Sequence, residues 1–401
     1  MSGARITVVG IGADGWDGLG ESARAAILGA EEVIGSERQL AMLPAAAPRA
    51  RPLPSPLGPL LDELSARSRG NVCVLASGDP MLHGIGATLA RRVGPERLQV
   101  IGHPSAFSLA CARLGWPAAE VELVSTVAVD PARVARLLQP GRRLIVFATG
   151  ADGAARVAGV VRDRGFGASR FIVLEQLGGE RERVLEETAT SWGEREADPL
   201  HAIAIECAAD PGATALPLTP GLPDEAYAHD GQLTKRHVRA LTIAALAPLP
   251  GELLWDVGAG TGSISIEWLR VEPRARALAI EQDPERAQRI AANATALGVP
   301  ELAVLRGVAP DALAGLDTPD AVFIGGGVTT GDTLERCWEA LAYGGRIVAN
   351  AVTLEGEARI VEARWRFGGE LLRIELAHAA PIGGFTGWRA QMPVVQWTAR
   401  K

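Results

Sequence analysis

An apolar run that leads directly into a glycine-rich turn and then into a helical pattern constrains this chain more than any other feature. Leu253–Val257 forms the run, Gly258-Ala-Gly260-Thr-Gly262 forms the turn, and SISIEWLR forms the helical pattern. Glycines let the backbone approach a ligand closely, and a helix N-terminus offers free N–H groups. The segment therefore predicts a strand, a turn and a helix, with a ligand site where the strand ends.

The spacing of the glycines separates the candidate ligands. Dinucleotide loops read Gly-x-Gly-x-x-Gly, whereas here Gly262 comes one place early and Ser263 holds the place of the third glycine. Asp256, two places before the first glycine, suits a loop that orders a cationic amino-acid group. Glu281 ends the next strand-like run, about 20 residues on, where a carboxylate accepts both hydroxyls of a ribose. An ordinary glycine-rich turn is the alternative, and Glu281 and the strand-helix context weigh against it.

Strand-like runs alternate with helical patterns through the rest of the C-terminal half. Thr234 is the expected N-cap of the helical pattern KRHVRALTIAAL, and Pro393–Thr398 is the expected antiparallel edge strand. The region resembles class I methyltransferases, which implies a Rossmann-like fold and S-adenosylmethionine (SAM) as methyl donor. Amine-methylating members carry an Asn/Asp-Pro-Pro-aromatic motif where this chain has Phe323-Ile-Gly-Gly-Gly327. Carbon is therefore the expected methyl acceptor.

The N-terminal half opens with another strand, loop and helix pattern, whose strand is Ile6–Val9. Two further loops, Ala76–Pro80 (ASGDP) and Gly102–Pro117 (GHPSAFSLACARLGWP), each follow a strand-like run, which is where open α/β sheets bind ligands. Asp79 fits two roles there, as a partner of a cationic cofactor group or as the cap of the following helix. His83 is expected to be packed or solvated rather than catalytic.

Together with the opening VVGIGADG and the stretch VLEQLGGERERV (Val173–Val184), these loops resemble the tetrapyrrole methylase family. The resemblance implies a fold of two α/β lobes that uses the same methyl donor on an unrelated scaffold. Members often carry Ser-x-His-Gly-Arg where this chain reads Ser125-Thr-Val-Ala-Val-Asp130. Substrate contacts at that segment are therefore expected to differ from those of other members.

A segment rich in Pro and Gly, from Asp210 to Gln232, separates the two resemblances, because it forbids a continuous helix or a central strand. We expect a tetrapyrrole methylase domain at 1–209, with two α/β lobes split near 115. A linker at 210–228 and a class I SAM-dependent methyltransferase domain at 229–401 follow. The fold class of the whole chain is α/β.

This pairing of domains resembles the bifunctional decarboxylating precorrin methyltransferases of cobalamin biosynthesis, as do the segments HDGQLTKRHVRA, LWDVGAGTGSISIEW and RIVANAVTLE. The resemblance implies C-methylation of a precorrin macrocycle at carbon 5 by the first domain. It implies methylation at carbon 15 by the second domain, with decarboxylation of the ring C acetate. It also implies two SAM sites, one at Gly78, Asp79, Ser105 and Ala106 and the other at Thr234, Gly258, Ala259, Gly260, Thr261, Gly262, Glu281 and Ala309.

No catalytic acid or base is assigned, which fits a reaction in which an electron-rich ring carbon attacks a sulfonium methyl group and orientation is the main task. A precorrin carries many carboxylates, which a chain of net charge −7 must meet with individually placed cations. Lys235 and Arg236 are the candidate substrate-binding residues. The alternative is that both solvate the outer face of a helix.

Composition limits the remaining possibilities. The acidic charge and the 4% of aromatic residues disfavour the main alternative, an RNA or DNA methyltransferase with an accessory N-terminal domain. A noncatalytic scaffold is the second alternative. Four scattered cysteines predict neither a metal site nor a disulfide framework, and no targeting segment or membrane span of about 20 residues is visible. We therefore expect a cytoplasmic protein that acts on a small-molecule tetrapyrrole, without nucleic-acid or membrane partners. The resemblance to these families implies a homo-oligomer.

Overall fold

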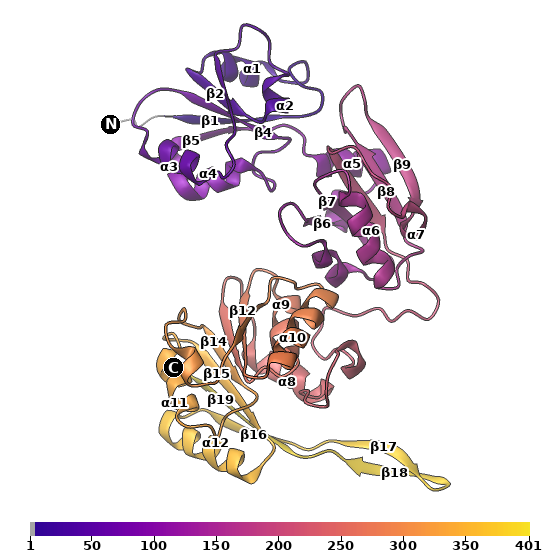
Figure 1. Ribbon diagram of the computed structural model, residues 1–401, viewed down its shortest axis with the longest axis vertical. Coiled ribbons are helices and arrows are strands. Elements are labelled where there is room, and N and C mark those ends of the chain that lie inside the picture. The colour runs from indigo at the N-terminus through magenta and orange to yellow at the C-terminus, as the bar shows by residue number, and fades with distance from the viewer. Residues whose placement is uncertain (1–4) are drawn as a thin grey trace. The chain divides into compact units, whose positions relative to one another are not determined.

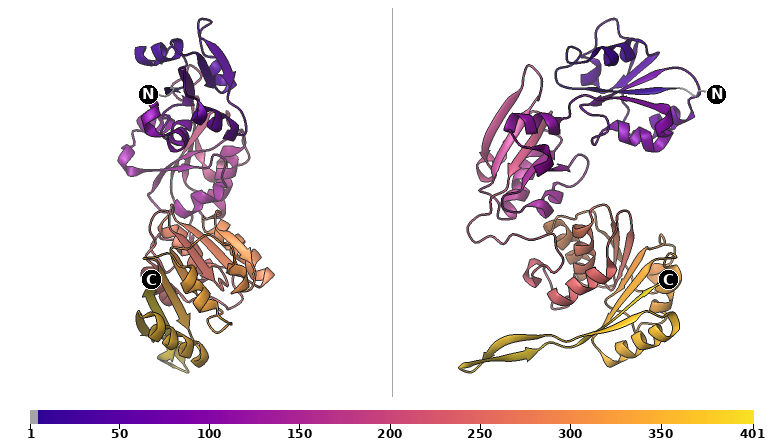
Figure 2. Two further views of the ribbon diagram at one scale, coloured as in Figure 1. Left: turned by 90° about the vertical axis from the view of Figure 1, so that its left-hand side faces the viewer. Right: turned by 180° about the vertical axis from the view of Figure 1, so that it is seen from behind.

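The structure, a computed structural model, describes residues 5–401, and the chain divides into two compact units (Figures 1 and 2). The first unit extends to Pro131 and includes Pro140–Ala213, and the second consists of Ala132–Gln139 and Thr214–Lys401. Both units are built from sheets flanked by helices, which confirms the predicted α/β class. In residues 5–401, no helix combines the length and apolarity needed to cross a bilayer.

The first lobe of the first unit is a five-stranded sheet, ordered β3-β2-β4-β1-β5, in which all neighbouring strands are parallel. Alternate residues of β1 pack into separate cores on the two faces, because successive side chains point to opposite sides of a sheet. The elements in chain order are β1 (Ile6–Ile11), α1 (Glu21–Leu28), β2 (Glu32–Gly35), α2 (Glu37–Leu40), β3 (Arg49–Pro52), α3 (Gly58–Ala66), β4 (Val72–Ser77), α4 (Ile85–Val93) and β5 (Leu98–Ile101).

The second lobe is a mixed sheet, ordered β6-β7-β10-β8-β9, in which the neighbours β6 and β7 are parallel and every other pair of neighbours is antiparallel. Its two-lobed partnership with the first sheet is the arrangement that the tetrapyrrole methylase resemblance implies. The elements are α5 (Ala106–Leu114), β6 (Val121–Ser125), β7 (Arg143–Phe147), α6 (Gly153–Asp163), β8 (Arg170–Glu175), β9 (Arg183–Thr188), α7 (Ala189–Trp192) and β10 (His201–Glu206).

The second unit is organised around a seven-stranded sheet, ordered β13-β12-β11-β14-β15-β19-β16. The five strands from β13 to β15 are parallel and alternate with helices in sequence. The elements are α8 (Arg236–Leu246), β11 (Leu253–Val257), α9 (Ser263–Val271), β12 (Arg276–Glu281), α10 (Pro284–Ala296), β13 (Ala303–Arg306), β14 (Ala321–Ile324), α11 (Thr333–Ala340), β15 (Arg346–Ala351), α12 (Leu354–Phe367), β16 (Glu370–Ile374), β17 (Ala377–Ile382), β18 (Phe385–Ala390) and β19 (Val394–Arg400).

Both faces of this sheet are covered, each by its own core. Leu254 and Phe323 pack with α8, α9 and α10, whereas the adjacent residues Trp255 and Ile324 pack with α11 and α12 on the other face. Because the parallel strands share one direction, the carboxyl ends of β11, β12, β14 and β15 lie at one edge of the sheet. That edge is where an open α/β sheet places its ligand.

The C-terminal strands confirm an antiparallel end to the sheet and correct its detail. β19 is antiparallel, as predicted for Pro393–Thr398, but it lies between β15 and β16, so that β16 is the outermost strand. Between β16 and β19 the chain forms an antiparallel hairpin, β17–β18, which extends away from the sheet (Figure 1). The hairpin was not anticipated from the sequence.

The start of α8 also corrects an expectation. Thr234 is not the N-cap, because the helix begins at Arg236 and Lys235 occupies the cap position without a side-chain cap. Asp224, from the preceding segment, takes over this role with its Oδ1 atom, which accepts a hydrogen bond from the Arg236 N–H at 3.0 Å. The N-terminus of α8 is therefore stabilised by tertiary structure rather than by its own sequence.

A buried ion pair holds this preceding segment in place. Arg239 of α8 donates from Nε to Glu267 Oε1 of α9 at 2.6 Å, and both side chains are buried. Glu267 also accepts hydrogen bonds from the N–H groups of Gly221 and Leu222 and from the hydroxyl of Tyr227. Removal of either charge would leave the other buried and unpaired, which typically lowers the free energy of unfolding by about 3–5 kcal/mol.

Ala132–Gln139 packs within the second unit although its neighbours in sequence belong to the first. Gln139 Nε2 donates a hydrogen bond to the carbonyl of Leu216 at 3.2 Å, and Arg133 lies 3.5 Å from the carboxylate of Glu301. This short segment is therefore part of the folded surface of the second unit.

Candidate active site

The glycine loop of the second unit lies between β11 and α9, as the sequence predicts. Gly258, Gly260 and Gly262 adopt φ angles of +71°, +61° and +75°, which disfavour any residue with a side chain. A Cβ atom on Gly258 would lie 2.7 Å from the backbone of Gly326 in the loop after β14. The two glycine-rich loops therefore approach each other too closely for any other residue at this position.

Glu281, at the end of β12, is directed at the glycine loop. Its Oε2 atom accepts a hydrogen bond from the Gly260 N–H at 2.8 Å, and its Oε1 atom accepts one from Asp283 N–H at 3.0 Å. The side chain is buried, with 4% of its surface exposed. Two backbone contacts thus hold the carboxylate rigidly where the ribose of a nucleoside would lie.

Asp256 lies beneath the same loop and is almost fully buried. Its Oδ2 atom accepts hydrogen bonds from the backbone N–H of Ser265 at 3.1 Å and from the Ser265 hydroxyl at 2.7 Å. Its Oδ1 atom is buried without a hydrogen-bond partner. Burial raises the pKa of Asp256 to about 6, and the opposing hydrogen bonds from Ser265 limit the rise. A cation close to Oδ1 would favour the ionised form.

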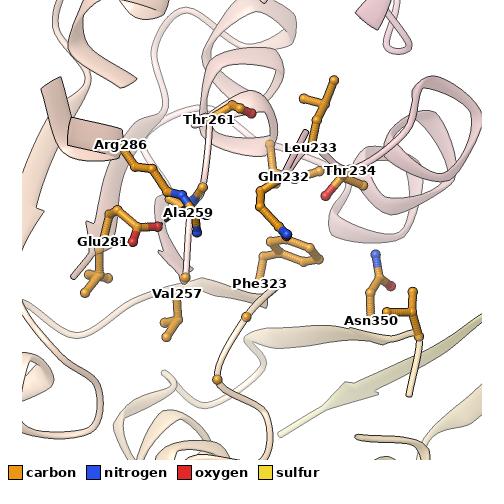
Figure 3. Close-up of a pocket in the computed structure, with 18 of the residues that line it drawn as sticks. Gln232, Leu233, Thr234, Val257, Ala259, Thr261, Glu281, Arg286, Phe323 and Asn350 are labelled. Atoms are coloured by element: carbon orange, nitrogen blue, oxygen red, sulfur yellow. Dashed lines mark hydrogen bonds between the residues drawn. The ribbon is translucent and has the colours of Figure 1, made fainter. Parts of the chain in front are cut away.

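A cavity of about 680 Å³ opens beside these groups. Figure 3 shows Glu281 and Arg286 at one end, Phe323 in the middle, and Thr234 with Asn350 at the other end. Gly262 is the only residue predicted for this SAM site that does not line the cavity; it instead caps α9. The predicted residues that do line it are Thr234, Gly258, Ala259, Gly260, Thr261, Glu281 and Ala309, together with the substrate candidate Lys235.

Asn350, at the far end of this cavity, was not predicted as a site residue. Its Nδ2 group donates to Thr242 Oγ1 at 3.0 Å, and its Oδ1 atom accepts from Gln396 Nε2 at 3.0 Å. Gln396 is buried in β19, and Thr242 in α8. The carboxamide of Asn350 is therefore held in a fixed orientation on the cavity wall by residues from two other elements.

Candidate residues of the first unit come together at the carboxyl ends of β1, β4 and β5. A Cβ atom on Gly78, whose φ is +58°, would lie 3.3 Å from Pro104 O and from Ser105 Cα. Ser105 is buried and caps α5, accepting a hydrogen bond from the Ser108 N–H at 3.0 Å, and Ala106 is the first residue of that helix. The loops after β4 and β5 thus contact each other.

Asp79 satisfies a turn of its own chain segment. Its Oδ1 atom accepts a hydrogen bond from the Met81 N–H at 2.8 Å, two residues on. His83, with φ of +54°, lies edge-on to Phe147 at a ring-centroid distance of 6.3 Å. Both observations describe local packing, and the second Oδ atom of Asp79 is left for a ligand.

His103 and Asp14 form a close pair of side chains beside these loops, and neither residue was predicted as a site residue. The His103 Nε2 atom lies 3.1 Å from Asp14 Oδ1, in the loop after β1, and the imidazole is largely buried. A Cβ atom on Gly12 would lie 2.7 Å from His103 Nε2. The glycines of the opening VVGIGADG therefore make room for His103. In residues 5–401, no group of His, Cys, Asp or Glu side chains has the arrangement of a metal site.

Comparisons with known proteins define the class. The family model of the tetrapyrrole (corrin/porphyrin) methylases matches residues 5–192, and that of the precorrin methyltransferase domain matches 225–401. The chain therefore combines a tetrapyrrole methylase domain with a precorrin methyltransferase domain, which places it among the SAM-dependent methyltransferases.

Relatives over the whole length define the family. The chain is 47% identical over 397 residues to the precorrin-6Y C(5,15)-methyltransferase (decarboxylating) of Sinorhizobium sp, which covers 99% of this chain and 96% of that protein. It is 44% identical over 400 residues to the protein of the same name from Mycobacterium tuberculosis strain H37Rv, with 99% and 100% covered. The chain belongs to the family of precorrin-6Y C(5,15)-methyltransferases (decarboxylating).

Shorter relatives match less of the chain. The probable cobalt-precorrin-6B C(15)-methyltransferase (decarboxylating) of Pyrobaculum calidifontis is 36% identical over 187 residues, which cover 45% of this chain and 96% of that protein. The crystal structure of the C-terminal domain of precorrin-6Y C5,15-methyltransferase from Rhodobacter capsulatus is 49% identical and covers 46% of this chain and all of that chain, with a TM-score of 0.44.

Proposed function

We propose that the chain divides the activity of its family between two SAM sites, one in each domain. As a member of that family, the protein is a SAM-dependent C-methyltransferase of cobalamin biosynthesis, which methylates precorrin-6Y at C5 and C15 with decarboxylation. In the proposed division, the N-terminal domain methylates C5, and the C-terminal domain methylates C15 and removes the carboxyl group. The relative named for C15 methylation and decarboxylation supports this division, because its 187 matched residues correspond to about one domain.

The observation that carries the second site is the close contact between the Gly258 loop and Gly326, with Glu281 bonded to Gly260 N–H. The space left by the absence of a side chain at Gly258, together with the buried carboxylate of Glu281, fits an adenosine-bearing cofactor. When bound, SAM supplies an electrophilic methyl group. Glu281 would accept the ribose hydroxyls, and the ionised Asp256 would favour the positive charge of the donor through the loop between them. The donor contacts proposed here are Thr234, the loop Gly258–Gly262, Glu281 and Ala309.

The middle of the cavity has the character of a carbon-methylating site. Phe323 and the glycines that follow it present an apolar surface, without the side-chain acceptors that an amine substrate needs. We assign to Asn350 the task of fixing the macrocycle edge, because both groups of its carboxamide are already oriented by Thr242 and Gln396. Orientation in a near-attack geometry is the largest contribution that such a site makes.

For the first SAM site we propose Gly78, Asp79, Ser105 and Ala106, on the loops that meet after β4 and β5. Ser105 caps α5 through the Ser108 N–H, and the small residues beside this cap let a donor approach the other main-chain groups of the first turn. Lys235 and Arg236 remain the proposed carboxylate-binding residues of the second site.

Mass spectrometry of the product tests the division. Wild-type protein with precorrin-6Y and SAM should yield a product that has gained two methyl groups and lost one carboxyl group. A product with a single added methyl group would mean that one domain is a noncatalytic scaffold. Because Ala132–Gln139 packs within the second unit, full-length variants are preferable to halves separated near Pro220. Tight tRNA binding in a gel shift at low salt would instead favour a nucleic-acid methyltransferase.

Two further features of the assembly belong to this proposal. A homo-oligomer is supported by two aromatic residues of β18, Phe385 at the tip of the hairpin and Trp388 in mid-strand, which expose 84% and 77% of their surface. Light scattering of the purified protein would give its mass in solution. A cytoplasmic location is supported by four buried free cysteines, which need no oxidising compartment.

A further inference from the structure

A second cavity, of about 600 Å³, adjoins the candidate donor cavity of the second unit. The two share Lys235 and Gln391 in their walls. One wall of the second cavity is the N-terminus of α8 with the segment before it, and the other is the base of the β17–β18 hairpin. The proposed methylation site accounts for the first cavity, and of the second cavity it involves only the residues at the start of α8, not those of the hairpin.

The walls of this second cavity gather positive charge from two distant segments. Lys235 and Arg236 come from the start of α8, and Arg389 comes from β18. His378 is the cross-strand partner of Arg389 in the hairpin, so both side chains lie on one face of it. The His378 ring lies 5.6 Å from that of His237, the residue after Arg236. The hairpin and the helix therefore present cations and N–H donors to the same space.

Two of these cations have no counter-ion. Within residues 5–401, neither the Arg236 nor the Arg389 guanidinium has an ion-pair or hydrogen-bond partner. Asp224, one of two acidic residues in the wall, is already engaged: its Oδ1 atom accepts from Arg236 N–H and from Arg239 Nη2. The Oδ2 atom of Asp224 lies 3.9 Å from Lys235 Nζ, so Glu225 is the acidic residue of this wall that is left to oppose Arg236 and Arg389. An uncompensated group of cations beside a cavity favours an anionic ligand.

We propose that the second cavity binds peripheral carboxylates of the tetrapyrrole, which would make the β17–β18 hairpin part of the substrate site. The inference rests on the proposed function of the adjoining cavity. Arg236 and Arg389 each offer a planar fork of N–H donors that matches a carboxylate, and His237 and His378 add single donors. Bound in this way, the macrocycle passes Lys235 and Gln391, with one edge in the donor cavity and its carboxylates in the second cavity.

Arg389→Gln tests the proposal in the full-length protein. Glutamine keeps much of the length and the hydrogen-bonding capacity of the side chain but removes its charge, and the exposed hairpin position makes misfolding a small risk. The KM for precorrin-6Y in C15 methylation should rise about tenfold, as expected for the loss of one charge-assisted hydrogen bond near solvent. The kcat and the SAM affinity from calorimetry should stay unchanged. Arg389→Lys should recover part of the loss, because it keeps the charge but not the fork.

Arg373→Gln is the matched control, since Arg373 is an exposed arginine of β16 that pairs with Glu375 outside both cavities. It should leave the KM unchanged. The dependence of KM on ionic strength should be steeper for the wild type than for Arg389→Gln, because salt screens exposed charges. Equal KM values and equal salt dependence in Arg389→Gln and the wild type would overturn the proposal.

A second measurement separates this proposal from the proposed function. The affinity for an octacarboxylate porphyrin, measured from the quenching of the porphyrin fluorescence on binding, reports on the carboxylate site without requiring methyl transfer. Weaker binding in Arg389→Gln supports the site even if the wild type fails to methylate precorrin-6Y, a failure that would refute the function alone. Unchanged porphyrin binding, alongside normal methylation by the wild type, refutes the site and leaves the function intact.

Discussion

The two candidate donor sites both lie in loops at the carboxyl ends of parallel strands, but they differ in how deeply their carboxylates are buried. In the second unit, two carboxylates are buried beneath a glycine loop, and Glu281 and Asp256 expose only 4% and 1% of their surface. In the first unit, Asp79 is partly exposed and one of its oxygens is engaged with Met81 N–H. Burial strengthens electrostatic interactions because it excludes water. We therefore expect donor binding at the second site to depend on fixed charges, and donor binding at the first site to depend on the main chain and on close packing of loops.

Gly258→Ala should break the second site most completely. The new Cβ atom would lie 2.7 Å from the backbone of Gly326, at a φ of +71°. Strain and overlap of about 3 kcal/mol together would weaken SAM binding there on the order of 100-fold. Mass spectrometry should find a product with one added methyl group and an intact acetate, because the first site is untouched.

Gly251→Ala provides the control for backbone strain alone. Gly251 has a similar φ of +84°, but a Cβ atom there would meet nothing within 4 Å. This variant should lose some stability and keep both methylations. If Gly258→Ala still added two methyl groups and removed the carboxyl group at the wild-type rate, the second unit would not hold the C15 site.

Glu281→Gln should have the next largest effect. The amide oxygen can still accept the hydrogen bond from Gly260 N–H, so the glycine loop should keep its contact, but the NH2 group cannot accept the bond that Oε1 takes from Asp283 N–H. The loss of charge weakens the contacts with the ribose, and hydrogen bonds to charged groups are worth about 1.5–3 kcal/mol. Calorimetry should show SAM affinity at the second site reduced about 10- to 100-fold, with C5 methylation retained. Equal loss at both sites would show that the domains are coupled.

The pKa of Asp256 predicts a dependence on pH that only the second site should show. Its folded-state pKa of about 6 lies above the ordinary value of 3.8 because burial disfavours the charged form. If cationic SAM binds best when Asp256 is ionised, its affinity should fall about tenfold between pH 7 and pH 5. Asp256→Asn should remove this dependence. A SAM affinity equally sensitive to pH in Asp256→Asn would exclude Asp256 as the titrating group.

The same residue makes a prediction about stability. A raised folded-state pKa contributes stability that is present below the unfolded value of 3.8 and is lost as pH rises through about 6. In the absence of SAM, the free energy of unfolding of the wild type should therefore fall relative to that of Asp256→Asn as the pH rises from about 4 to about 6. Chemical denaturation of both proteins at several pH values measures the difference.

The parts of the molecule that could be read from the sequence are those in which neighbours in sequence are also neighbours in space. The glycine loop, the strands beside it and the position of Glu281 at the end of β12 follow from one strand-turn-helix pattern. The expected N-cap at Thr234 was wrong because the capping oxygen comes from Asp224, ten residues earlier. No local pattern indicates which distant residue supplies such an acceptor.

The features that were missed depend on which strands are neighbours. The carboxamide of Asn350 is oriented by Gln396. Gln396 reaches it because β19 pairs directly with β15. Arg389 reaches the start of α8 only because the β17–β18 hairpin returns to it. Non-local pairing is not encoded in hydrophobic periodicity, so these positions required the structure.

Asp79→Asn should have the smallest effect, and it tests the contrast between the two sites directly. Asparagine can accept the hydrogen bond from Met81 N–H and therefore preserves the turn. If the first site relies mainly on its main chain, loss of the charge should reduce the rate of C5 methylation only about threefold, which corresponds to less than 1 kcal/mol. Asp79→Ala, which also removes the turn acceptor, should cost more because it loosens the loop that contacts Ser105. A loss of 100-fold or more in Asp79→Asn would show instead that the first site depends on a fixed carboxylate as strongly as the second.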